Sequence, residues 1–188
     1  MKGPWTLPNF ITLLRLAMLP FFLMAISNGS FGLALGIFVA AGISDGIDGF
    51  LARRFDMRSA LGAYLDPIAD KLMLMSSYVF LSIPSYPGIH KIPFWLVVMV
   101  LSRDLLMLTV ALLMILTAHG RSFRPTWVGK VTTVTLIVNV LFVLCGNLWD
   151  WPSPPLLIGC GASATVVLLS SFHYIYLVAR GEEGAPQA

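Results

Sequence analysis

Six long apolar stretches dominate this chain, and they limit what it can fold into. Each is about 20 residues long, the length that an α-helix needs to cross the hydrocarbon core of a bilayer. Of the 188 residues, 57% are hydrophobic and only 11% are charged, and the mean hydropathy is +0.85. Water-soluble domains of this length carry far more charge. The sequence therefore predicts an all-α integral membrane protein with six transmembrane helices.

Turn-forming residues separate these stretches and set the expected boundaries. Helices are expected at residues 9–26, 31–53, 59–83, 92–118, 126–145 and 156–179. A short segment before the first helix contains Trp5 and is expected to lie at the membrane interface. Residues 181–188 are expected to form a disordered tail. The whole chain, residues 1–188, is expected to be a single membrane domain.

Four aspartates lie within two of the apolar stretches, although the chain has only nine acidic residues. Carboxylates are costly in hydrocarbon and usually mark a working site. Asp45 and Asp48 share one face of the second helix, and two more, Asp66 and Asp70, line one stripe of the third. If these helices form an antiparallel pair, the acidic faces can meet and would need a cation between them. Ligands made only of oxygen favour Mg²⁺ or Mn²⁺.

The spacing of these aspartates resembles the signature of the CDP-alcohol phosphotransferase family. That signature reads D-x-x-D-G-x-x-A-R-x8-G-x-x-x-D-x-x-x-D, and all eight fixed positions match between Asp45 and Asp70. The resemblance implies a metal-dependent transfer of the phosphatidyl group of CDP-diacylglycerol to an alcohol, with release of CMP. It implies four metal-site residues, of which the last is also the candidate base: Asp45, Asp48, Asp66 and Asp70.

Four further motif positions are expected to contact the nucleotide together with Asp48: Gly49, Ala52, Arg53 and Gly62. Gly49 and Ala52 are small, so a nucleotide can approach the helix backbone there. Arg53 is expected at the membrane surface, where a guanidinium can bind phosphate. Gly62 either opens space for the substrate or serves plain helix packing, and both interpretations stay open.

Three basic residues are candidates for binding the acceptor: Arg103, Arg124 and Lys130. Arg103 lies deep in the fourth helix beside Asp104, so it either binds an anionic acceptor or satisfies a partner within the membrane. The run Ser102-Arg103-Asp104 resembles mitochondrial-type cardiolipin synthases. Phosphatidylglycerophosphate synthases, which are also similar, typically carry a further arginine two turns on, but residues 105–116 hold no basic residue. A phosphomonoester dianion needs that extra cation, so phosphatidylglycerol is the expected acceptor and glycerol 3-phosphate the alternative.

Basic residues concentrate at one set of helix ends. Seven of them are expected on one side of the membrane: Lys2, Arg53, Arg54, Arg58, Arg121, Arg124 and Arg180. Only Lys91 is expected on the other side. By the positive-inside rule, both termini and the acidic site face the cytoplasm, and a bacterial cytoplasmic membrane is the simplest location. The family resemblance also suggests a homodimer, and no nucleic-acid partner is expected.

The first helix carries a polar face whose direction the sequence leaves open. Asn9, Thr12 and Arg15 are three residues apart and therefore lie on one side of the helix. That side either points into the protein or lets the Arg15 side chain reach the lipid headgroups.

A divalent-cation transporter is the competing class of function, because such proteins also place carboxylates on facing helices. A transport path needs polar residues on both sides of the acidic cluster. Residues 31–39 and 79–83 are almost wholly apolar, which favours the enzyme over the transporter.

Overall fold

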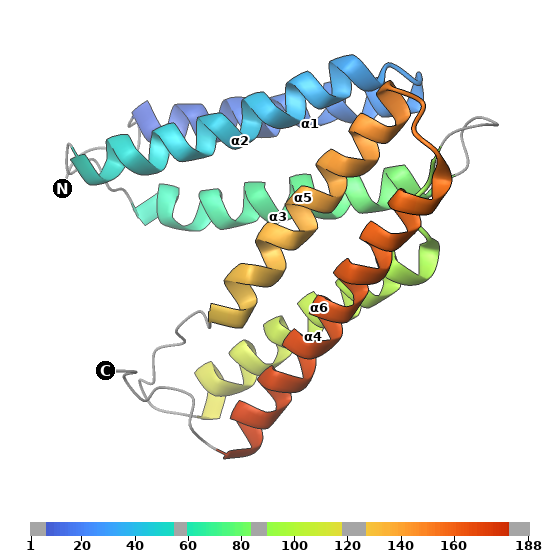
Figure 1. Cartoon of the computed structure of the whole chain (residues 1–188). Helices are drawn as coiled ribbons and strands as arrows, with labels where there is room; N and C mark the ends of the chain where they lie inside the picture. The colour runs from blue at the N-terminus through green and yellow to red at the C-terminus, as the bar shows by residue number, and fades with distance from the viewer. Residues whose placement is uncertain (1–6, 55–59, 84–89, 118–126, 181–188) are drawn as a thin grey trace. The chain divides into compact units, whose positions relative to one another are not determined.

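The computed structural model describes residues 7–54, 60–83, 90–117 and 127–180, and the regular structure in these ranges is helical (Figure 1). The helices are α1 (Leu7–Ser27), α2 (Phe31–Arg54), α3 (Ala60–Ser82), α4 (Phe94–Thr117), α5 (Trp127–Leu148) and α6 (Ser153–Arg180). Side chains are described for residues 10–47, 65–83, 90–110 and 127–177. The prediction of an all-α chain with six helices is confirmed. The expected interfacial segment, residues 1–6, and the expected tail, residues 181–188, lie outside the described residues.

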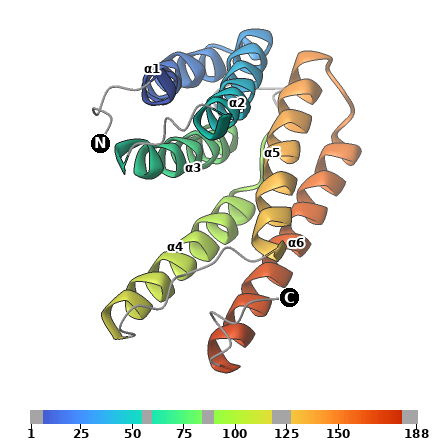
Figure 2. The same cartoon turned by 90° about the vertical axis from the view of Figure 1, so that its left-hand side faces the viewer.

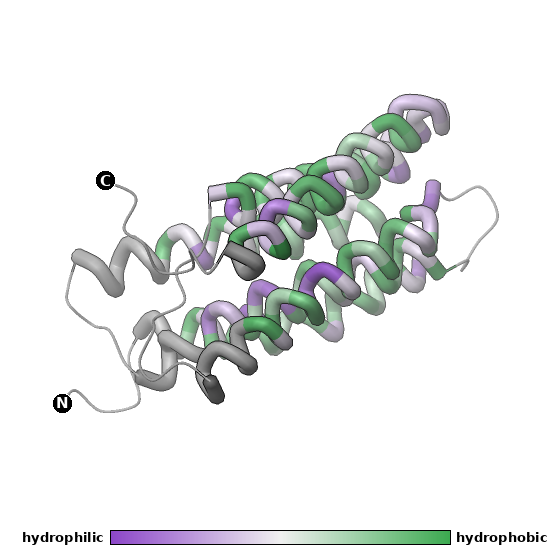
Figure 3. The backbone as a smooth tube through the Cα atoms, turned by 90° about the horizontal axis from the view of Figure 1, so that it is seen from below, coloured by the Kyte–Doolittle hydropathy of each residue, from purple (hydrophilic) through white to green (hydrophobic). Residues whose placement is uncertain are grey.

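Three of these helices are long and apolar enough to cross a membrane, at Phe10–Ser27, Trp127–Leu148 and Ser153–Leu177. A shorter apolar helical stretch covers Phe31–Ile47. Hydrophobic residues occur along the length of the described helices (Figure 3), and large ones such as Ile158 are exposed on the helix surfaces. Exposed apolar surface on this scale is favourable in lipid and costly in water. An integral membrane protein follows, and six spans remain the predicted number.

The chain packs as two compact units. The first unit contains Met1–Lys91 and Val143–Trp151, and the second contains Ile92–Phe142 and Pro152–Ala188. Helix α5 therefore contributes its last residues to the first unit and the rest to the second. Within the first unit, α1 packs against both α2 and α3 (Figure 2). The expected single domain over residues 1–188 stays a prediction.

A tight turn sets α1 against α2. Gly29 has a φ of 70°, in the left-handed region that residues with a Cβ avoid. Its N–H donates to the carbonyl of Ile26, and the N–H of Ser30 donates to the carbonyl of Ala25, which together form a Schellman motif. Beyond the turn, the rings of Phe22 and Phe38 pack with centroids 5.7 Å apart. The predicted turn between the first two helices is confirmed.

The end of α5 holds the segment that precedes α4. The side-chain oxygen of Asn147 accepts from the main-chain N–H of His90 at 2.7 Å, and its side-chain nitrogen donates to the His90 carbonyl at 2.9 Å. Nearby, an ideal Cβ built at Gly32, next to the first residue of α2, would lie 3.5 Å from Leu148. The end of α5 and the segment before α4 therefore lie close to the first residues of α2.

In the second unit, α4 packs against α6, and α5 approaches α6 closely at a glycine. An ideal Cβ at Gly159 would lie 3.2 Å from the ring of Phe142. The expected loop over residues 146–155 is too long, because α5 continues to Leu148 and α6 already begins at Ser153. Pro154 and Pro155 occupy the first turn of α6, where a missing N–H costs no hydrogen bond. The other predicted helix ends agree with the structure within two residues.

Candidate active site

The polar face of α1 points into the protein, toward the acidic residues of α2 and α3. Thr12 is completely buried and Arg15 is only 3% exposed. The Thr12 hydroxyl donates to Oδ1 of Asp66 at 2.5 Å. Of the two directions left open for this face, the inward one is therefore observed. Asn9 shares the face by its spacing, but its side chain lies outside the described residues.

One nitrogen atom of Arg15 connects the two acidic helices. Its Nη1 lies 3.0 Å from Oδ1 of Asp45, and the same atom donates to Oδ1 of Asp70. The carboxylates of Asp45 on α2 and Asp70 on α3 are therefore neighbours, although 25 positions separate them in the sequence. The charged guanidinium offsets the repulsion between the two carboxylates and the cost of burying Arg15.

The side chains of Asp45 and Asp70 remain accessible, although the arginine that they contact is buried. The Asp45 side chain is 45% exposed and that of Asp70 is 50% exposed, against 2% for Arg15. Each carboxylate also has a second oxygen that is not the one in contact with Nη1. A substrate or a cation can thus reach both aspartates without displacing α1.

The described aspartates supply the kind of ligand that a hard cation prefers, namely carboxylate oxygen. Among the described side chains, no group of three His, Cys, Asp or Glu residues is drawn together closely enough to hold a metal ion. Asp45 and Asp70 nevertheless meet at a cationic group, and Asp48 is the one predicted ligand whose side chain lies outside the described part. These carboxylate oxygens are ligands that suit a divalent ion, and in this structure the guanidinium of Arg15 supplies the positive charge beside them.

Several predicted site residues fall where side chains are not described. The backbones of Asp48, Gly49, Ala52 and Arg53 lie in the last turns of α2, and that of Gly62 lies in the first turn of α3. Their side chains lie outside the described part, as does the whole of Arg124. The nucleotide-binding roles of these residues stay predictions.

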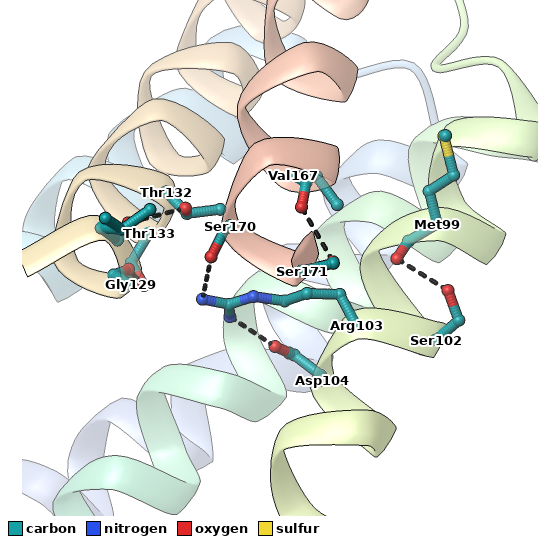
Figure 4. A network of polar contacts seen from close by, with 11 residues as sticks. Met99, Ser102, Arg103, Asp104, Gly129, Thr132, Thr133, Val167, Ser170 and Ser171 are labelled. Carbon is teal, nitrogen blue, oxygen red and sulfur yellow. Dashed lines mark hydrogen bonds and ion pairs between the residues drawn. The ribbon is translucent and has the colours of Figure 1, made fainter. Parts of the chain in front are cut away.

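Arg103 is the centre of a buried polar network in the second unit (Figure 4). Its Nη1 donates to Oδ1 of Asp104 at 2.8 Å, and its Nη2 donates to the hydroxyl of Ser170 on α6 at 3.3 Å. Arg103 is 6% exposed, Asp104 5% and Ser170 3%. The Nε of Arg103 is buried without a hydrogen-bond partner in the described part of the chain. Arg103 therefore has partners within the second unit, and among the described residues its Nε–H has none.

Lys130, another predicted acceptor residue, is exposed near the start of α5. Its Nζ lies 5.3 Å from the centroid of the Trp127 ring, one turn earlier on the same helix. A cation–π contact of this kind restricts the lysine side chain and leaves its charge available.

Comparison with known protein families shows the family of the chain. A family model described as CDP-alcohol phosphatidyltransferase matches residues 5–176 of the chain. The chain belongs to the CDP-alcohol phosphatidyltransferase family. The match covers both units and includes every aspartate of the candidate site.

Curated members of the CDP-alcohol phosphatidyltransferase family resemble the chain over most of its length. Cardiolipin synthase (CMP-forming) of Homo sapiens is 31% identical over 166 residues, which cover 80% of this chain and 54% of the relative. A protein named "Probable phosphatidylglycerophosphate synthase" of Mycobacterium tuberculosis is 38% identical over 145 residues, covering 73% of this chain and 66% of the relative.

A third relative matches almost end to end. It is the CDP-diacylglycerol–glycerol-3-phosphate 3-phosphatidyltransferase of Blochmanniella floridana, 28% identical over 179 residues, which cover 94% of this chain and 92% of that protein. By contrast, the chain spans about half the length of the Homo sapiens and Rattus norvegicus relatives that it matches.

Sequence reasoning missed two participants in these polar networks. For Thr12 the sequence predicts only a face shared with Arg15, and nothing in the sequence pairs it with Asp66. Ser170 carried no signal at all, because a serine in an apolar helix usually bonds to its own backbone, as Ser171 does with the carbonyl of Val167. Only the fold shows which serine crosses to a neighbouring helix.

Proposed function

We propose that this protein transfers the phosphatidyl group of CDP-diacylglycerol to the hydroxyl of an alcohol and releases CMP. Membership in the CDP-alcohol phosphatidyltransferase family supports the reaction class. The structural observation that supports it most directly is the meeting of Asp45 and Asp70 at one nitrogen of Arg15, with Asp66 bonded to the same helix. Drawing acidic residues together inside a membrane protein costs free energy, so such a cluster usually marks a functional site.

The proposed site requires Mg²⁺ or Mn²⁺, held by Asp45, Asp48, Asp66 and Asp70. Such an ion would neutralise the pyrophosphate of the donor and the charge that grows on the leaving CMP. Gly49, Ala52 and Gly62 would let the nucleotide approach the helices. Arg53 would bind a phosphate of the donor.

Asp70 is the proposed base. In the reaction, the acceptor hydroxyl attacks the phosphorus that carries the diacylglycerol, a new P–O bond forms, and the bond to the CMP phosphate breaks. The proton of the hydroxyl passes to a carboxylate oxygen of Asp70. This role is compatible with the half-exposed Asp70 side chain, since one oxygen can contact Arg15 while the other faces the substrate.

The proposed acceptor is phosphatidylglycerol, so the product would be cardiolipin. Arg103, Arg124 and Lys130 are the proposed acceptor-binding residues. Asp104 already neutralises Arg103 at 2.8 Å, and residues 105–116 add no cation, so the pair suits the single charge of a phosphodiester. Glycerol 3-phosphate is the second candidate, because two of the relatives carry names of enzymes that make phosphatidylglycerophosphate.

The proposed setting is the cytoplasmic membrane of a bacterium, with the acidic site open to the cytoplasm and the protein present as a homodimer. The distribution of Lys and Arg supports the orientation. A soluble CMP product would then leave directly into the compartment where nucleotides are used.

One assay tests the reaction and the acceptor together. Purified protein is mixed with CDP-diacylglycerol, Mg²⁺ or Mn²⁺, and either phosphatidylglycerol or glycerol 3-phosphate, and CMP and lipid products are measured by mass spectrometry. Cardiolipin with phosphatidylglycerol alone supports the proposal. Product with glycerol 3-phosphate alone would transfer the assignment to the second candidate. No CMP with either acceptor would overturn the proposed reaction and favour the cation transporter.

A further inference from the structure

We infer that Arg15 is a built-in counter-ion of the acidic site, which holds Asp45 and Asp70 together without a metal and lowers the affinity of the site for a divalent cation. The inference rests on the proposed metal site and adds a residue outside the aspartate motif. It assigns to α1 a direct electrostatic role in metal binding.

The burial of Arg15 shows that its charge is compensated within the protein. The residue is 3% exposed and lies within the apolar stretch Phe10–Ser27. An arginine in such a stretch normally extends its side chain toward the headgroups or pairs with an acid. Here it pairs, because Nη1 contacts the carboxylates of both Asp45 and Asp70.

The geometry places the Arg15 charge where a bound cation would also find its ligands. One atom, Nη1, contacts Oδ1 of Asp45 and Oδ1 of Asp70 from opposite acidic helices. Thr12, one turn earlier on α1, binds Oδ1 of Asp66 through a neutral hydroxyl. Helix α1 thus supplies a donor to each of the three aspartates of the candidate site whose side chains are described, and of the donors Arg15 and Thr12 only Arg15 is charged.

Two consequences follow from this arrangement. Without a metal, Arg15 stabilises the fold by reducing the repulsion between the carboxylates. With a metal, the fixed positive charge repels the incoming ion and competes for the same oxygens, so binding is weaker than four carboxylates alone would give. An ion that must be exchanged, and a site that must stay folded without it, would both benefit from such a residue.

The test compares Mn²⁺ binding and thermal stability in purified Arg15→Met, Arg15→Lys and unchanged protein. Free Mn²⁺ is counted by electron paramagnetic resonance, and melting is followed with and without Mn²⁺. We expect Arg15→Met to bind Mn²⁺ at least about fivefold more tightly, since a neighbouring unit charge is removed. Its melting temperature should fall without metal and recover when Mn²⁺ is added. Arg15→Lys keeps the charge and should bind Mn²⁺ much as the unchanged protein does.

Lys91→Met is the matched control for loss of one positive charge. Lys91 follows His90, whose backbone Asn147 binds close to the start of α2. Asp45 lies 14 positions after Phe31, the first residue of α2. That separation is about 20 Å along a helix, beyond the screening length at physiological salt. The control should therefore leave Mn²⁺ affinity unchanged.

Every outcome decides the question. Unchanged or weaker Mn²⁺ binding in Arg15→Met overturns the inference. If Arg15→Met can be purified only when Mn²⁺ is present, the inference is supported; if it cannot be purified even then, the inference is overturned. Absence of Mn²⁺ binding in the unchanged protein would instead overturn the proposed metal site, so the two failures are distinguishable.

Discussion

Arg103 and Asp104 are consecutive residues of α4, yet their side chains meet as a buried ion pair, with Nη1 of Arg103 2.8 Å from Oδ1 of Asp104. Ser170 adds a hydrogen bond to the same guanidinium from α6. The pair and the serine link two helices of the second unit through buried polar groups. This arrangement leads to the first two predictions.

Removing the charge of Asp104 should destabilise the protein strongly. Asp104→Asn leaves Arg103 buried without its counter-charge, which costs about 3–5 kcal/mol in buried pairs. Thermal unfolding in detergent should show a clear loss. Ser102→Ala is the matched control on the same helix, because the Ser102 hydroxyl is exposed and, among the described residues, bonds to the carbonyl of Met99 on its own helix. Equal stability of the two variants would contradict a structural role for the ion pair.

Ser170→Ala should affect the acceptor rather than the donor. If Arg103 binds the acceptor, the loss of one hydrogen bond to its guanidinium should raise the KM for phosphatidylglycerol about threefold or more, with the KM for CDP-diacylglycerol unchanged. Ser170→Thr should restore it. Ser171→Ala is the control, since that hydroxyl bonds to its own helix at Val167. A uniform loss of activity toward both substrates would argue for a merely structural role.

Asp70→Asn should stop the reaction and leave donor binding partly intact. The amide keeps the size of the side chain but cannot accept the proton of the attacking hydroxyl, so CMP release should fall by about 10²-fold or more. CMP release and binding of a labelled CDP-diacylglycerol are measured in parallel. Asp150→Asn is the control, because Asp150 is exposed and its φ of 49° is one that asparagine also tolerates. Turnover that survives in Asp70→Asn would remove this residue as the base.

Replacing Gly29 should lower the melting temperature more than replacing Gly36, which lies within helix α2 of the same unit. Its φ of 70° makes an added Cβ unfavourable by about 1–2 kcal/mol, even though the space around it is open. Gly29→Ala should therefore melt at a lower temperature. Gly36→Ala on α2 also meets open space but has ordinary helical geometry, so it should be neutral or stabilising by about 0.5–1 kcal/mol. Similar melting temperatures for the two variants would contradict the strain at Gly29.

The sequence predicted the helices well, because length and apolar composition are local properties. It also placed Asp45 and Asp70 on faces that could meet. It could not show that α1 brings them together, since the contact between Arg15 and both acids depends on how three helices pack. The predicted start of α6 is wrong for a local reason, because two prolines suggest a loop unless they fall in the first turn of a helix, as Pro154 and Pro155 do.

The two hydrogen bonds between the Asn147 side chain and the main chain of His90 predict that position 90 tolerates more substitutions than position 147. The Asn147 amide accepts from the N–H of His90 through its oxygen and donates to the His90 carbonyl through its nitrogen, and few other side chains carry a separate acceptor and donor at this length, so most exchanges there should be harmful. His90 contributes only its backbone to this contact, and the Nε2 of its ring is buried without a hydrogen-bond partner among the described residues. A saturation library should therefore accept many residues at position 90 but reject proline, which alone lacks the N–H that Asn147 binds.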